Sequence, residues 1–456
     1  MDALAELRIA CPGLVLRTAE AERAALGLDA LTPSRGRPEL AELQHPPLAV
    51  AEPASVASVV ALVRWAAAAR VPLVARGGGS GLMGGAAVFQ PAVVADLRRL
   101  DRITVDVDAC VVQAGAGATL ARVDAALAEH GLMLGHDPWT VEVATVGGVL
   151  GTNGLGYLGG RTGSMRTQLR GLEVVLADGT VVRTPAVPTR STGLDLAHLF
   201  IGTEGTLGIV TEATLVALPR PEERIVASFE LPSFDVGVSL AAAFRRAGIR
   251  PTCLELSADD EESPRTASLL LVFDGLRGEA SLHAARAEEL LEQAGATQRA
   301  REVAEREWQA RHAIAERWAA SRRARPGMPW RPGGEFDYAH VAVPLARVPA
   351  LRETTRALVH RHGLSLVEEG LWHWPELYSV VVAGPLGSAG GMRATIDGIL
   401  RAAQEAGGSM EYCHGVGWKL AHLMTSEHGT GALEVLRRVK AALDPAGILN
   451  PGKGGV

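Results

Sequence analysis

Glycine is the feature that most constrains the fold of this chain. The sequence has 52 glycines among its 456 residues, and they are concentrated between Arg76 and Gly208 in three clusters, at 76–85, 145–160 and 201–211. Glycine permits tight turns and lets the backbone approach a neighbour closely. A turn without a ligand is the alternative for any one cluster. Three clusters separated by strand and helix patterns predict that the backbone wraps one long ligand.

The first cluster predicts a phosphate-binding loop. It follows a strand predicted at 73–75, and successive N–H groups without side chains form a nest for an anion. Gly79 to Gly84 match the GxGxxG pattern, but that fingerprint normally opens a helix within a βαβ unit. Only residues 86–91 separate the loop from the next predicted strand, at 92–96, which is too short for a helix. A nicotinamide dinucleotide on a Rossmann fold is therefore disfavoured.

Composition excludes several classes of function. The net charge is −6 and no basic block alternates with aromatic residues, so no nucleic-acid partner is expected. The densest basic stretch, 317–325, is interpreted as a solvated helix end. No apolar run approaches the roughly 20 residues of a membrane helix, and the N-terminus lacks a signal-peptide pattern. The four cysteines are far apart and form no CxxC pair. We expect a cytoplasmic protein.

Length and pattern predict more than one domain. A β-hairpin is expected at 172–176 and 181–183, joined by Asp178-Gly179. Prolines at 219 and 221 then break the chain, and strand-like runs alternate with long helices as in an α+β layer. We predict a helical N-terminal segment and two domains followed by a C-terminal segment, with boundaries at 1–45, 46–220, 221–425 and 426–456.

Four motifs together resemble a known flavoprotein superfamily. They are VPLVARGGGSG at 71–81, ATVGG at 144–148, FIGTEGTLGIVTEATL at 200–215 and DPAGILNPGK at 444–453. The chain resembles the vanillyl-alcohol-oxidase/p-cresol-methylhydroxylase (PCMH-type) FAD-binding superfamily, in its FAD-linked oxidase branch of D-lactate, glycolate and D-2-hydroxyglutarate dehydrogenases. The middle of the chain matches only in the rhythm of its elements.

The resemblance implies an α+β fold with FAD as the cofactor. Residues 46–220 would form a PCMH-type FAD-binding domain of two α+β subdomains. Residues 221–425 would form an α+β cap domain for the substrate, an antiparallel sheet covered by helices, and 426–456 would return to the FAD domain. Members that attach FAD covalently often use a histidine of the first glycine loop. That stretch here is Gly79-Ser80-Gly81, so non-covalent FAD is expected.

The resemblance also assigns cofactor-binding residues by matching positions. The assigned residues are Arg76, Gly77, Gly78, Gly79, Ser80, Gly81, His136, Asp137, Pro138, Thr145, Gly147, Gly148, Thr152, Asn153, Glu204, Gly208, Ile209, Val210 and Asn450. Lys453 is the alternative to Asn450.

Some details resemble another member of the superfamily, alkylglycerone-phosphate synthase. They are GHDP at 135–138, STG at 191–193 and HGVG at 414–417. The dehydrogenases carry a GHxGDGNxH metal motif in the cap, whereas the corresponding stretch from Gly370 retains His373 as its one candidate ligand, so no metal site is predicted. The run of histidines in the synthase is reduced here to Tyr412-Cys413-His414, which argues against the chemistry of the synthase.

Three side chains are catalytic candidates for flavin-dependent oxidation, which needs a base for the hydroxyl proton and an anchor for substrate charge. His414 lies in a glycine-flanked turn and is the candidate base, a structural turn histidine being the alternative. Tyr378 begins a predicted cap strand and is a second candidate proton donor. Arg311 resembles a helix arginine of the family that holds a carboxylate or phosphate, a surface arginine being the alternative.

Three functions follow from these features. The first is an FAD-dependent oxidoreductase, either a dehydrogenase or an oxidase, that transfers hydride from a 2-hydroxy acid or related alcohol to FAD. The second is a flavin transferase like alkylglycerone-phosphate synthase, without net redox change. The third is a flavin-binding subunit of a larger oxidase complex. A small-molecule substrate is expected in the first two, the electron acceptor is undetermined, and a homodimer or a partner subunit fits the sequence.

Overall fold

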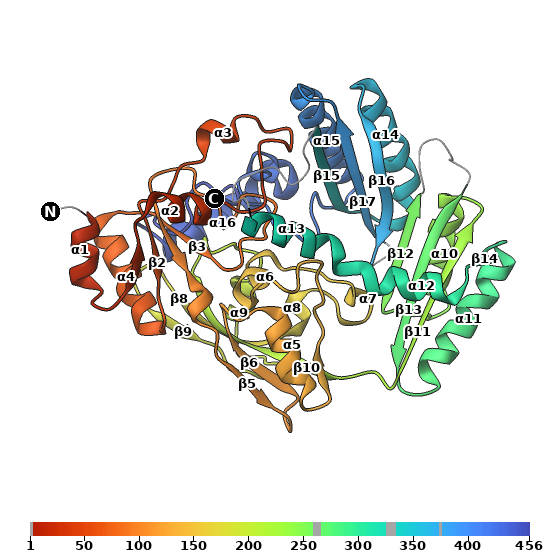
Figure 1. The fold of residues 1–456 in the computed structure, drawn as a ribbon, viewed down its shortest axis with the longest axis horizontal. Coiled ribbons are helices and arrows are strands. Elements are labelled where there is room, and N and C mark those ends of the chain that lie inside the picture. The colour runs from red at the N-terminus through yellow and green to blue at the C-terminus, as the bar shows by residue number, and fades with distance from the viewer. Residues whose placement is uncertain (1–2, 259–265, 325–333, 374–375) are drawn as a thin grey trace.

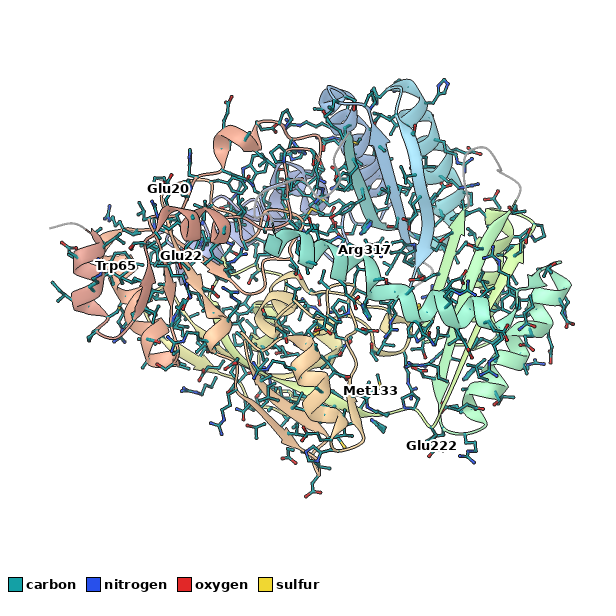
Figure 2. All side chains as sticks on the ribbon, in the orientation of Figure 1. Glu20, Glu22, Trp65, Met133, Glu222 and Arg317 are labelled. Atoms are coloured by element: carbon teal, nitrogen blue, oxygen red, sulfur yellow. The ribbon has the colours of Figure 1, made fainter. Side chains whose placement is uncertain are left out.

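A computed structural model describes residues 3–258, 266–324, 334–373 and 376–456. They form two lobes (Figure 1). The lobe with the N-terminus contains two sheets, and the other contains one large sheet with most of its helices on one face and a further helix packed on the opposite face. The last residue of the basic stretch, Arg325, lies outside the described residues, whereas Arg317 is exposed on helix α13 (Figure 2).

The first sheet has four strands in the order β1-β2-β4-β3. Strands β2, β4 and β3 are parallel, and β1 pairs antiparallel with β2. Ser55 caps helix α4 through a capping box with Ser58. The bounds are β1 Val15–Arg17, β2 Ala49–Glu52, β3 Leu73–Arg76, β4 Val93–Asp96, α1 Ala3–Ala10, α2 Glu20–Leu26, α3 Leu40–Leu43 and α4 Val56–Ala69. The strand β1, within the segment expected to be helical, belongs to this sheet.

The second sheet is antiparallel, in the order β5-β6-β10-β8-β9, with β7 paired to the end of β10. The predicted hairpin is present as β8 and β9. The bounds are β5 Ile103–Asp106, β6 Val111–Gly115, β7 Leu132–Leu134, β8 Leu169–Val175, β9 Val181–Arg183, β10 Ile209–Pro219, α5 Leu120–Ala128, α6 Val146–Thr152, α7 Gly159–Thr162, α8 Met165–Gln168 and α9 Leu196–Leu199.

The third sheet has seven antiparallel strands in the order β14-β11-β13-β12-β16-β17-β15. Strands β12 and β16 lie at its centre, and neither is expected from the sequence pattern. The bounds are β11 Glu223–Leu231, β12 Cys253–Ala258, β13 Ala267–Gly275, β14 Thr297–Gln298, β15 Glu335–Ala342, β16 Ser365–Trp372, β17 Leu377–Gly384, α10 Phe234–Arg246, α11 Glu279–Gln293, α12 Arg301–Gln309, α13 Ala313–Ala324, α14 Val348–Arg361, α15 Ala389–Glu405 and α16 Met424–Leu443.

Alternation along the strands of the third sheet separates its two faces. Leu254 and Leu256 of β12 pack in the apolar core formed with α10, α11, α14 and α15. Residues at the intervening positions, such as Glu255 and Ser257, line a cavity on the other face. The same alternation places Val380 and Val382 of β17 in the core, so the sheet presents one continuous wall to the first lobe.

Candidate functional site

Two adjoining cavities lie between the lobes. One, of about 220 Å³, is lined by all three glycine clusters. The other, of about 500 Å³, is lined by the third sheet, α12, α13 and the loop around His414. Both are lined by Ser80, Leu82, Trp139, Thr140, Leu155, Cys413 and His414, so the two spaces meet there. We call them the glycine cavity and the cap cavity.

Backbone forms much of the wall of the glycine cavity, because glycines without side chains pack closely there. A Cβ on Gly77 would lie 2.0 Å from Thr145 Oγ1, and one on Gly78 would lie 1.9 Å from the Val143 carbonyl oxygen. The first two glycine clusters therefore press against each other and tolerate no side chain at their contact. Gly81 differs, because a Cβ there would meet only Asp29, at 3.8 Å, and the residue lines the cavity.

Buried polar atoms face this cavity without a protein partner. His136 is 2 % exposed, and burial lowers its pKa to about 4, so the imidazole is neutral. Among the described residues neither of its ring nitrogens nor Thr145 Oγ1 has a hydrogen-bond partner. Buried polar groups are nearly always satisfied. Both residues line the glycine cavity, which points to a ligand with polar edges there.

The third cluster is hydrogen-bonded to the loop that contains His414 and to the C-terminal segment. Glu204 Oε2 accepts hydrogen bonds from the N–H groups of Val416 (3.0 Å) and Gly417 (2.7 Å). Burial raises the pKa of Glu204 to about 7. Asn450 Nδ2 donates to the carbonyl oxygens of Gly85 and Glu204, and Lys453 Nζ donates to those of Gly85 and Ala87. These bonds hold the loop with His414 against the glycine cavity.

Most of the predicted cofactor residues line the glycine cavity, and three do not. Asp137 directs its carboxylate to Arg311 and His312. Asn153 caps α6 in a left-handed conformation and accepts a hydrogen bond from the Arg166 N–H. Asn450 joins two loops, as described above. The lining residues among those predicted are Arg76, Gly77, Gly78, Gly79, Ser80, Gly81, His136, Pro138, Thr145, Gly147, Gly148, Thr152, Glu204, Gly208, Ile209 and Val210.

His414 lines both cavities, which places it where they meet. Its Nδ1 lies 3.4 Å from Glu411 Oε1. That carboxylate oxygen also accepts the backbone N–H groups of Tyr412, Cys413 and His414, which fixes the loop. The ring of His340, on β15, lies 4.7 Å from the ring of His414 between centroids, and burial holds the pKa of His340 well below its usual range.

Arg311 lines the cap cavity, between α12 and α13. Its Nε donates to Asp137 Oδ2 at 2.9 Å, its Nη1 donates to the Trp308 carbonyl oxygen, and its guanidinium lies 4.1 Å from the Trp308 ring centroid. His312 Nε2 lies 2.8 Å from the other oxygen of Asp137. Asp137 therefore positions the guanidinium at the cavity wall.

Tyr378 is a correction to the sequence analysis. It is fully buried on the face of the third sheet that packs against the helices, and its hydroxyl donates to Glu369 Oε1 at 2.7 Å. It lines neither cavity. The candidate role of Tyr378 as a proton donor to the substrate is therefore wrong, because side chains alternate along β17 and Val381, three positions further on, is the residue that lines the cap cavity.

Several lining residues escaped the sequence analysis. They include Tyr338 and His340 of β15, Glu255 of β12 and Trp372 of β16. Tyr338 and His340 lie at alternate positions of β15, and two polar aromatic residues with this spacing were a usable signal that the cavity face of the strand is functional. Glu255 lies on an unpredicted strand and gave no such signal.

Comparison with known proteins shows similarity to FAD-linked oxidoreductases. A family model described as "FAD binding domain" matches residues 47–185, and one described as "FAD linked oxidases, C-terminal domain" matches residues 220–454. A D-2-hydroxyglutarate dehydrogenase from Xanthomonas citri is 32% identical over 89% of this chain and 89% of its own length. A zebrafish (Danio rerio) protein named probable mitochondrial D-lactate dehydrogenase is 30% identical, over 93% of this chain and 87% of its own.

Solved structures share the fold at low sequence identity. Alkyldihydroxyacetonephosphate synthase matches with a TM-score of 0.78 and 18% identity, covering 99% of this chain and 85% of its own. p-Cresol methylhydroxylase matches with a TM-score of 0.76 and 16% identity, covering 100% and 96%. Among the described residues, no helix has both the length and the apolar content needed to cross a membrane. The fold is thus of the PCMH type, and the chain belongs to the FAD-linked oxidase family.

Proposed function

We propose that this chain oxidises the CH–OH group of a 2-hydroxy acid or a related alcohol, with FAD bound non-covalently in the glycine cavity and His414 as the base. The position of His414, where the glycine cavity meets the cap cavity, is the observation that carries the proposal. Relatives named for D-lactate, D-2-hydroxyglutarate and glycolate support the substrate class.

The residues of the glycine cavity fit FAD. Gly81 and Gly148 leave room beside the cavity, where a Cβ would meet no atom closer than 3.4 Å. Backbone N–H groups of the first cluster suit a pyrophosphate. His136 and Thr145 offer polar atoms without a protein partner. FAD, when bound, supplies the redox chemistry by accepting two electrons as hydride.

Several polar groups of the cap cavity have a role in this proposal. His414 takes the substrate hydroxyl proton on a ring nitrogen, and Glu411 holds the imidazole in place. Arg311, positioned by Asp137, meets the carboxylate of a hydroxy acid. Tyr338, His340 and Trp372 form the wall that excludes water around the reacting carbon.

Anaerobic bleaching of the purified chain tests the proposal. Acid precipitation should release a yellow cofactor into the supernatant, and a substrate among D-2-hydroxy acids and small alcohols should bleach its visible absorption without any partner protein. A colourless protein that takes up no FAD would overturn the proposal. Bleaching that requires a second protein would favour the subunit function, and product formed without an electron acceptor would favour the transferase.

His414 provides the chemical test. We expect His414→Asn to lower the rate of FAD reduction by about 10²–10⁴-fold, the usual contribution of a general base. FAD content should stay unchanged, because the close contacts that form the wall of the glycine cavity do not involve this imidazole. His428→Asn, at an exposed position of α16, is the matched control. Equal rates in the two variants would remove His414 from the mechanism.

A further inference from the structure

The cap cavity is lined by a large share of the aromatic residues of the chain. Aromatic side chains make up 4% of the sequence, yet three of the four tyrosines and three of the eight tryptophans line this cavity, together with one phenylalanine. Sites that bind small molecules are lined mainly by apolar and aromatic side chains. The wall therefore suits a ligand with a large apolar surface. The aromatic residues are Tyr157, Tyr338, Tyr412, Trp139, Trp318, Trp372 and Phe336.

One part of this wall is apolar and lies away from the glycine cavity. It combines residues of the N-terminal segment, of helix α13 and of strands β15 and β17, and we call it the apolar sector. Its six members line the cap cavity, and none of these described residues lines the glycine cavity, so the sector is available to the substrate rather than to FAD. They are Leu31, Pro33, Ile314, Trp318, Phe336 and Val381.

Sheet pairing and one backbone hydrogen bond join two sides of the apolar sector. Phe336 of β15 pairs with Ala383 of β17, which places Val381 diagonally across on the same face of the sheet. The Phe336 N–H donates to the Ser34 carbonyl oxygen at 3.1 Å, so the N-terminal segment with Pro33 runs beside β15. The two strands and the N-terminal segment therefore form one continuous wall.

Helix α13 places further apolar side chains at a fixed distance from the carboxylate anchor Arg311. The helix extends from α12 toward the N-terminal lobe (Figure 1). Ile314 and Trp318 follow Arg311 by three and seven residues, a spacing that puts all three side chains on one helix face. With a rise of 1.5 Å per residue, Trp318 lies roughly 10 Å along the axis from Arg311. Ile314 is 40 % exposed, which leaves apolar surface for a ligand to cover.

The cap cavity is larger than a small hydroxy acid needs. Its volume of about 500 Å³ lies within the range of about 300–1,000 Å³ that is typical of sites for drug-sized ligands. Lactate and glycolate carry at most a methyl group beside the reacting carbon, so either one held at Arg311 would leave the apolar sector without contact. A substrate with a bulky apolar side chain would remove that surface from water, which favours binding.

We propose that the substrate is a 2-hydroxy acid with an aromatic side chain, which binds in the apolar sector while its carboxylate meets Arg311. Trp318, Phe336 and Val381 then determine specificity. An aromatic ring is favoured over an aliphatic chain, because Trp318 and Phe336 offer it the offset and edge-to-face contacts that aromatic pairs prefer. The reaction of this substrate rests on the proposed function, whereas the binding of an aromatic carboxylate does not.

The rate of FAD reduction by three hydroxy acids tests the proposal. The FAD-loaded protein is mixed anaerobically with D-lactate, D-3-phenyllactate or D-2-hydroxyoctanoate. We expect the second-order rate constant for D-3-phenyllactate to exceed that for D-lactate by about 10–100-fold, the usual effect of burying a side chain of this size. D-2-hydroxyoctanoate should fall between them. Equal rate constants for D-lactate and D-3-phenyllactate, or the highest one for D-2-hydroxyoctanoate, would overturn the proposal.

Variants of the apolar sector locate the aromatic side chain. Val381→Phe fills the sector and should lower the ratio of the rate constants for D-3-phenyllactate and D-lactate by at least about 10-fold. Trp318→Ala removes an aromatic contact and should lower the same ratio. Val367→Phe, at a position of β16 that is 51 % exposed, is the matched control and should keep the ratio of the wild type. FAD content reports whether each variant folds. A ratio unchanged in both sector variants contradicts the assignment.

Binding without turnover separates this inference from the proposed function. 3-Phenylpropanoate and propanoate lack the reacting hydroxyl, and their Kd is measured from the change in the visible spectrum of FAD. We expect 3-phenylpropanoate to bind at least about 10-fold more tightly, and Val381→Phe to remove the difference. If this preference is present but no hydroxy acid reduces FAD, the proposed function fails and the inference stands. If hydroxy acids reduce FAD without a preference for the aromatic one, the inference fails and the proposed function stands.

Discussion

The glycine cavity and the cap cavity adjoin each other but are built in opposite ways. Backbone forms the first, through short contiguous clusters in which glycine is required by close contacts such as that between Gly78 and Val143. Side chains form the second, projecting at alternate positions from strands far apart in sequence. The comparison teaches that cofactor binding is encoded locally here, whereas substrate contacts depend on how the third sheet is assembled.

The largest effect is expected at the buried ion pairs behind the cap cavity. Asp337 binds Arg35 (2.6 Å) and Lys419 (2.6 Å), and all three side chains are at most 2 % exposed. Asp337→Asn leaves two buried cations without their counter-charge, which should cost about 3–5 kcal/mol in the free energy of unfolding. Urea unfolding measures it, with exposed Asp108→Asn as the control. A loss below about 1 kcal/mol would show that the wall does not depend on these pairs.

The next effect is the pH dependence of stability that comes from Glu204, which joins the third glycine cluster to the loop with His414. Burial raises the pKa of Glu204 to about 7 from 4.5, so the folded protein keeps a proton there that the unfolded chain has lost. Stability from this group is therefore full below pH 4.5 and falls as pH rises through 7, by up to about 3 kcal/mol. Glu204→Gln should make the free energy of unfolding depend less on pH, because an amide does not titrate. The two hydrogen bonds should remain, because the glutamine side-chain oxygen still accepts both N–H groups.

Unfolding free energies at pH 5 and pH 8 measure this difference. Glu20→Gln, on the exposed face of α2, is the control and should keep the slope of the wild type (Figure 2). Part of the slope should remain in Glu204→Gln, because burial also raises the pKa of Glu255 to about 7. A variant slope equal to that of the wild type would show that Glu204 is ionised without cost.

A side chain placed in the glycine cavity should weaken the binding of FAD. Gly81→Leu adds atoms beside the cavity where the backbone tolerates them, and overpacking of this kind costs about 1–3 kcal/mol, or roughly 10–100-fold in the Kd for FAD. Fluorescence titration of the apoprotein measures the change. Gly431→Ala, in open space on α16, should leave the Kd unchanged. Unaltered affinity in Gly81→Leu would place the cofactor elsewhere.

Local sequence pattern predicts the structure where it decides the structure by itself. The hairpin β8–β9 is present, and the first glycine loop runs to β4 without a helix, as predicted. Local pattern does not predict the side-chain contacts that tertiary structure decides. Asp137 and Asn450 belong to conspicuous motifs, but their side chains join segments of the protein rather than the cavity. Glu255 and His373 meet only because β12 pairs with β16, and no local pattern encodes that pairing.

The smallest expected effect tests the two faces of the third sheet. Tyr378 lies on the helix-covered face, and its hydroxyl donates to Glu369 Oε1. Tyr378→Phe removes that bond, but Glu369 Oε2 still accepts from Arg352 (2.8 Å) and Arg356 (2.9 Å). We therefore expect a loss of only about 1 kcal/mol in stability and an unchanged rate of FAD reduction.

Stopped-flow reduction and urea unfolding of the same variant separate these two quantities. Ser379→Ala, on the adjacent position and the opposite face, is the matched comparison, since its side chain points toward the first lobe. If Tyr378→Phe slowed FAD reduction as strongly as His414→Asn, the hydroxyl would act in proton transfer. The faces of β17 would then be reversed, and with them the separation of core from cavity on which the contrast between the two cavities depends.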